Sequence, residues 1–108
     1  MSGALHVHDA EYLIEQRIEA LRRLSWEEAS LLPRCAEEQV VVGGVACALT
    51  TYRQSGVLPN PGSVLVTVQL ARARCFGALS DHLQEGLVFE PGTPARRAAT
   101  AELLESGG

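Results

Sequence analysis

Apolar residues recur at helical spacing over residues 9–24. Asp9 is a residue type that commonly caps a helix N-terminus, and we expect it to begin this helix. Six apolar residues fall on one face of the helix: Ala10, Leu13, Ile14, Ile18, Leu21 and Leu24. The pattern predicts a long amphipathic helix with one buried face, preceded by a loose N-terminal segment, residues 1–8.

A second, shorter helix is predicted directly after the first. Ser25 is followed three residues later by Glu28, which is the spacing of a capping box at a helix N-terminus. Pro33 disfavours the helical conformation of the residue before it, so we expect this helix to end at Leu32.

Residues 38–52 alternate with the period of a strand on both sides of Gly43-Gly44. A two-residue turn at these glycines would pair Val42 with Val45 and, two positions on, Val40 with Cys47. A phosphate-binding loop would instead require a helix to begin just after the glycines. The residues that follow are β-branched and alternating, so the sequence favours a β-hairpin.

The rest of the chain predicts a central strand and shorter elements. The segment 63–71 is apolar on both faces, as in a strand that is buried on both sides. Residues 71–84 are compatible with a strand and a loop or with a short helix; Gly77 weakens a helix there, which favours the former. A short strand is expected at 86–90, a turn at Pro91-Gly92, and a short C-terminal helix that begins after Thr100.

These elements predict an α+β fold in one domain, residues 1–108. We expect an antiparallel meander of three to four strands, packed against the long N-terminal helix. A short second helix and a short C-terminal helix complete the prediction.

Composition and charge exclude several kinds of chemistry. The net charge of −4 is unfavourable for binding nucleic acid directly. All 9 basic residues are arginines, so no lysine is present to form a Schiff base or to bind phosphates in a P-loop. No apolar run is long enough to cross a membrane, and the first residues lack the pattern of a secretory signal. We therefore expect a cytoplasmic protein with reduced thiols.

Two local clusters contain residue types that carry chemistry. His6 and His8 would point the same way from a strand, but two imidazoles do not make a metal site. Cys75, Asp81 and His82 are close in sequence, whereas the members of a catalytic thiol site usually come from distant segments. We therefore predict no catalytic residue, no metal site and no cofactor.

Our first hypothesis is a small, non-enzymatic protein-interaction module, that is, a regulator, adaptor or inhibitor that binds another protein. An acidic helix face formed by Glu11, Glu15 and Glu19 would attract a basic partner. An edge of the sheet could add a strand from a partner or from a second copy of the chain, and in the latter case the protein would be a homodimer.

The alternative hypothesis is a small enzyme or a ligand-binding domain. Its pocket would lie between the first helix and the sheet. The polar residues that could line it are Arg17, Tyr52, Gln69 and His82.

Overall fold

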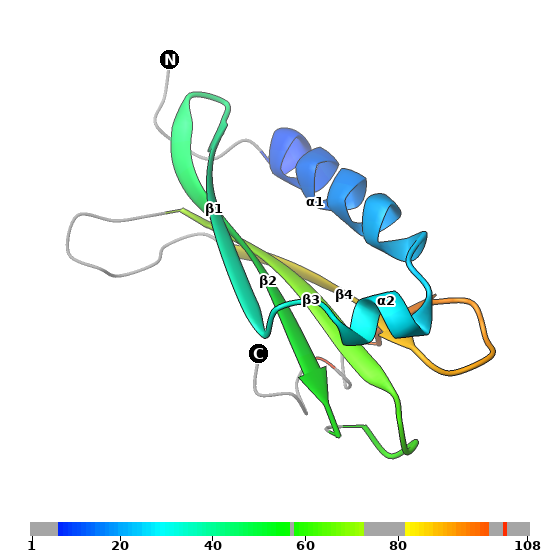
Figure 1. Cartoon of the computed structure of the whole chain (residues 1–108). Coiled ribbons are helices and arrows are strands. Elements are labelled where there is room, and N and C mark those ends of the chain that lie inside the picture. The colour runs from blue at the N-terminus through cyan, green and yellow to red at the C-terminus, as the bar shows by residue number, and fades with distance from the viewer. Residues whose placement is uncertain (1–6, 57, 73–81, 100–102, 104–108) are drawn as a thin grey trace.

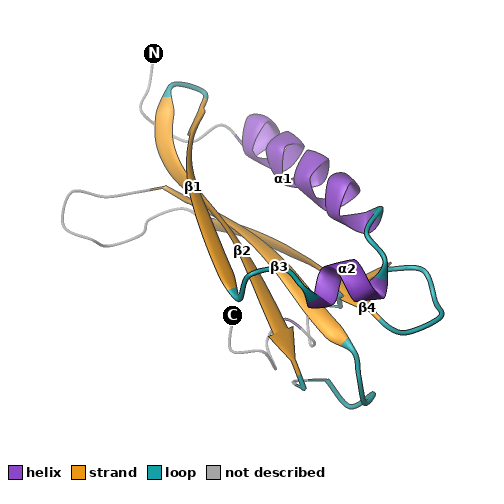
Figure 2. Cartoon of the chain, viewed as in Figure 1, coloured by secondary structure: helices purple, strands orange, loops and turns teal. Residues whose placement is uncertain are grey.

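The computed structural model describes residues 7–56, 58–72, 82–99 and 103, and it shows helices on one side of an antiparallel sheet (Figures 1 and 2). This is the α+β fold that the sequence predicts. The elements in chain order are α1 (Val7–Arg22), α2 (Trp26–Ser30), β1 (Cys35–Val42), β2 (Val45–Ser55), β3 (Val64–Arg72), β4 (His82–Phe89) and β5 (Arg96–Arg97).

The sheet is a meander in which every strand pairs with its neighbour in the sequence. The order is β1-β2-β3-β4-β5, and all four pairings are antiparallel. The described residues thus contain five strands, where the sequence predicted three to four. The additional strand, β5, has only two residues, which is too short to show an alternating pattern.

The hairpin between β1 and β2 has the predicted register. Val42 lies opposite Val45, and Val40 lies opposite Cys47. Gly43 and Gly44 have φ angles of 57° and 81°, and a type I′ turn requires positive φ at both central positions. The glycine pair therefore sets which side chains of the hairpin face the helices.

One side of the sheet, here called the helix side, holds the main core. Ile14 and Ile18 of α1 are buried against it, and α1 packs chiefly on β3 and β4. The strand residues of this core are Val42, Cys47, Leu49, Val64, Val66, Val68, Leu70, Leu87 and Phe89. Figure 2 shows both helices on this side. The predicted apolar face of the first helix is the face that is buried.

The other side of the sheet, here called the opposite side, carries a smaller apolar cluster. Leu65 and Val88 are buried there together with Leu58 and Leu103, and Ala98 packs against them. Because apolar side chains are covered on both sides, β3 is almost fully apolar, as its sequence predicted.

Several element boundaries differ from the predictions. The first helix ends at Arg22 instead of Leu24, and the second ends at Ser30 instead of Leu32. The first helix begins at Val7, so Asp9 lies in its first turn instead of capping it, and the predicted loose segment loses residues 7 and 8. Strand β4 begins at His82, four residues before the predicted start at 86, because it continues to pair with β3. Strand β3 ends at Arg72, and residues 73–81, for which a strand followed by a loop was favoured over a helix, lie outside the described part.

Of the predictions for the two short helices, one is confirmed and the other falls mostly outside the described residues. The capping box of α2 is confirmed: Ser25 Oγ accepts a hydrogen bond from the Glu28 amide at 3.0 Å, and the Glu28 carboxylate accepts one from the Ser25 amide at 2.8 Å. The predicted C-terminal helix falls mostly outside the described residues. Leu103 is described, and its amide donates to the carbonyl of Ala99 at 3.1 Å.

Candidate functional site

Strand β1 forms one edge of the sheet, and half of its backbone groups point away from β2. One position before the strand, the Arg34 carbonyl accepts a hydrogen bond from the Arg53 amide at 3.0 Å. In an antiparallel ladder, every second residue bonds to the same neighbour. The residues whose N–H and C=O groups point outward are therefore Cys35, Glu37, Gln39 and Val41. We call these four positions the outward edge.

The outward edge is exposed and carries little that would prevent pairing. Residues 35–39 are all exposed, and the Val41 side chain has 73% of its surface accessible. Residues 35–42 contain no proline and no bulge, which are common ways to protect an edge. Gln39 Nε2 donates to Glu37 Oε2 at 3.1 Å, so these two side chains lie along the edge instead of covering it.

The acidic helix face is partly neutralised by arginines of the same chain. Glu15 forms an ion pair with Arg97, and Glu19 pairs with Arg22 at 2.8 Å. The hydrogen bond to Glu15 is the main cause that raises the pKa of Arg97. Glu11 has no ion pair within the described part of the chain.

Glu11 instead borders a pocket of about 260 Å³ between α1 and β4. Its other lining residues are Ile14, Glu15, Leu83, Gln84 and Glu85.

Four residues were proposed to line a pocket between the first helix and the sheet, and the three whose side chains are described do not come together. Arg17 projects from α1 to β1, where its Nη2 lies 2.6 Å from Glu38 Oε1. Tyr52 and Gln69 lie on the opposite side of the sheet, away from α1, because they alternate with the core residues. The side chain of His82 lies outside the described part. Between α1 and the sheet lie the apolar side chains of the main core.

The thiols and carboxylates of the described segments show no catalytic or metal-binding arrangement. Cys35 is exposed and Cys47 is buried, and both are free thiols. Within these segments, no group of three or more His, Cys, Asp and Glu residues is placed to hold a metal ion. Cys75, Asp81 and His6 lie outside them. No helix in these segments has the length and hydrophobicity to cross a membrane.

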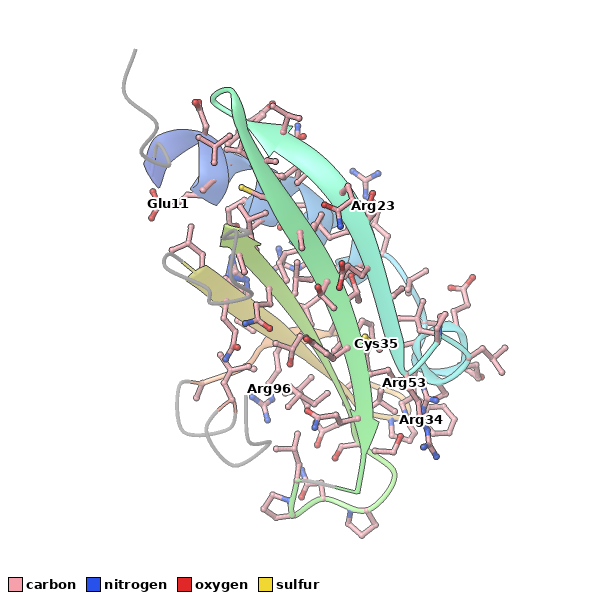
Figure 3. The ribbon with its side chains drawn as sticks, turned by 90° about the vertical axis from the view of Figure 1, so that its left-hand side faces the viewer. Glu11, Arg23, Arg34, Cys35, Arg53 and Arg96 are labelled. Carbon is pink, nitrogen blue, oxygen red and sulfur yellow. The ribbon has the colours of Figure 1, made fainter. Side chains whose placement is uncertain are left out.

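A pair of arginines that the sequence patterns did not single out borders a further pocket. Arg34 and Arg53 are cross-strand neighbours at the start of β1, and Figure 3 shows them at the same end of the sheet as Cys35. With Gln54 and Ser55, they line a pocket of about 330 Å³. The predicted hairpin register already contained this pairing. When the register is continued to one residue before Cys35, it places Arg34 opposite Arg53.

No protein-family model matches the chain, and comparisons with curated proteins and with solved structures find no match either.

Proposed function

We propose that the protein is a non-enzymatic interaction module that binds an extended segment of another protein along β1. The observation that carries this proposal is the exposed outward edge, where four residues present N–H and C=O groups that have no partner among the described residues. An added strand would satisfy these groups by main-chain hydrogen bonds, as in other complexes formed by strand addition.

The charges along β1 favour a basic partner strand over a second copy of this chain. β1 contains two carboxylates, Glu37 and Glu38, and no cation. Glu38 pairs with Arg17 of α1, and Glu37 has no ion pair within the described residues. Pairing with another copy would place the acidic residues of two β1 strands next to one another, and the net charge of −4 on each copy would add to the repulsion. A strand with a basic side chain opposite Glu37 and an apolar one opposite Val41 complements the edge.

The positions of Arg17 and Gln69, two of the residues proposed to line an internal pocket, favour binding by this edge over catalysis at those residues. An enzyme needs several polar groups directed at one reacting centre. Here Arg17 and Gln69 lie on opposite sides of the sheet, with the main core between them. The acidic helix face is less available than the edge because Glu15 and Glu19 already pair with arginines.

A peptide-display selection tests the proposal. The immobilised protein would select peptides from a random library, and the Gln39→Pro variant would be used in parallel. Proline at position 39 removes one outward N–H, and no hydrogen bond to β2 depends on that group. Gln39→Ala is the matched control because it keeps the N–H.

We expect enrichment of peptides in which basic and apolar residues alternate. The wild type and Gln39→Ala should bind them, and Gln39→Pro should not. Glu37→Lys provides a second test that does not require the strand to accept a proline. In this variant the preference should change to acidic peptides.

Two results would overturn the proposal. One is a selection without alternating peptides, or with peptides that bind Gln39→Pro equally well. The other is a dimer of the wild type in light scattering that Gln39→Pro dissociates, since the edge would then be occupied by a second copy.

A further inference from the structure

We propose that the pocket formed by Arg34, Arg53 and Ser55 binds a phosphoryl group. This site is separate from the strand-addition edge. It would take either inorganic phosphate or a phosphate monoester.

The first argument is the uncompensated charge. Arg17, Arg22 and Arg97 each form an ion pair with a carboxylate, whereas Arg34 and Arg53 have none within the described residues. Like charges directly opposite each other on neighbouring strands are unfavourable. A bound anion would remove this repulsion, and it would do so in a chain that is acidic overall.

The second argument is the way in which Arg53 is held. Its side chain is half-buried, and its Nε donates to the carbonyl of Leu32 at 2.6 Å. This bond fixes the plane of the guanidinium group while its terminal nitrogens remain near the pocket. Nη1 of Arg53 lies 3.4 Å from Ser55 Oγ, so a hydroxyl group adjoins the same position. A donor that is already oriented loses less entropy when it binds a ligand.

The third argument concerns the kind of anion. Two guanidinium groups supply two positive charges and several N–H donors, and the Ser55 hydroxyl supplies another donor. A phosphoryl group carries up to two negative charges and has three oxygens that accept hydrogen bonds, whereas a carboxylate carries one charge and has two oxygens. The phosphoryl group therefore matches both the charge and the number of donors.

The pocket is formed by side chains on the helix side, whereas the outward edge is formed by main-chain groups of other residues. The two can therefore be tested separately. The side chains of Arg34 and Arg53 share the helix side with the main core. Cys35, Glu37, Gln39 and Val41 alternate to the opposite side. A failure to bind phosphate would leave the peptide selection unaffected, and the reverse also holds.

The test is a titration followed by NMR at constant ionic strength. The probes are inorganic phosphate, phenyl phosphate and acetate, and the signals observed are the backbone amides and the arginine Nε–H groups. We expect saturable shifts at Arg34, Arg53 and Ser55 with phosphate, and weaker binding of acetate. Phenyl phosphate distinguishes the sources: binding at least as tight as that of inorganic phosphate identifies an ester, and weaker binding identifies the free ion.

Three variants complete the experiment. Arg34→Gln and Arg53→Gln should each weaken phosphate binding by about tenfold or more, since each removes charged hydrogen bonds. Arg23→Gln is the control, because Arg23 is an exposed arginine directly after α1 and has no ion pair within the described residues (Figure 3). Arg53→Gln also removes the hydrogen bond to Leu32 and could unfold the protein. Arg34 is exposed, so Arg34→Gln should fold and remains informative in that case.

Non-saturable shifts would overturn the proposal. So would an affinity for acetate equal to that for phosphate, or an equal loss of affinity in Arg23→Gln and Arg34→Gln.

Discussion

At position 86 of β4, a Cβ atom would lie 2.8 Å from Leu103 Cδ2 and 3.3 Å from both Ala98 Cβ and the Val66 carbonyl oxygen. The Leu103 side chain can rotate away from such an atom. Ala98 Cβ and the Val66 carbonyl belong to the backbone framework and cannot move without it. Glycine at this position therefore allows residues 98 and 103 to pack directly on the opposite side of the sheet.

We predict that Gly86→Ala lowers the free energy of unfolding by about 1 kcal/mol. Crowding of this kind costs about 1–3 kcal/mol, and the usual advantage of alanine over glycine in a strand offsets part of it. Urea denaturation measures the change. In the double variant with Leu103→Ala, the combined loss should be smaller than the sum of the two single losses, because the closest contact is absent. Equal stability of Gly86→Ala and wild type would contradict this prediction.

The candidate site shows what sequence can predict about single residues. The alternation in the hairpin predicted that Val42 lies opposite Val45 and Val40 opposite Cys47, and this was correct. Tyr52, which was proposed for the pocket beside the helix, faces the opposite side instead. It did not predict that Arg17 would pair with Glu38, or that Glu15 would pair with Arg97, 82 residues away in the chain. Such pairs depend on how α1 is placed over the sheet, which a periodic pattern does not specify.

At the scale of the elements, Arg97 connects three parts of the fold. From β5 it pairs with Glu15 of α1 and, at 3.0 Å, with Glu85 of β4. Because the pKa of Arg97 is raised, its charge is retained at every pH below that value. Its contribution to stability would be lost only as the pH rises through the folded-state pKa, far above neutral. These contacts should therefore respond to salt near neutral pH and not to titration of Arg97.

We predict that Arg97→Ala lowers the free energy of unfolding by about 0.5–1 kcal/mol at low salt, since the pairs are partly exposed. The loss should shrink in about 1 M salt, where screening is strong. Thermal or urea denaturation at both salt concentrations checks this. Arg23→Ala, directly after α1, is the control and should change stability little. A loss that does not depend on salt would show that Arg97 acts through packing instead.

The sequence predicted those elements whose patterns are long enough to be periodic. The helix face of Ile14 and Ile18 and the strand from Val64 both repeat over several residues, and both were found. The start of β4 was missed because its pairing partner sets it: Leu83 lies opposite Leu70, and Gln84 lies opposite Gln69. Strand β5 was missed for the related reason that its two residues are defined only by pairing with β4.

At the scale of the whole molecule, the contact between α1 and the sheet forms part of the main core. Ile18 of α1 belongs to this core and has no exposed surface. We predict that Ile18→Ala lowers the free energy of unfolding by about 2–5 kcal/mol, because it removes buried methyl groups and leaves a cavity. Tyr12→Ala, on the same helix, should cost much less, since 66% of the Tyr12 side chain is exposed. Equal losses for the two variants in urea denaturation would contradict this view of the core.

The meander order has a consequence for how the chain folds as it is synthesised. Each hairpin joins segments that are adjacent in the sequence, so its loop can close soon after the second strand emerges. The first helix is different, because its partners are β3 and β4. Its apolar stripe is synthesised before both of these strands, and its partners are complete only when residue 89 has been added. This helix is thus made well before it can take its final place, and an apolar stripe that stays exposed during that interval favours aggregation.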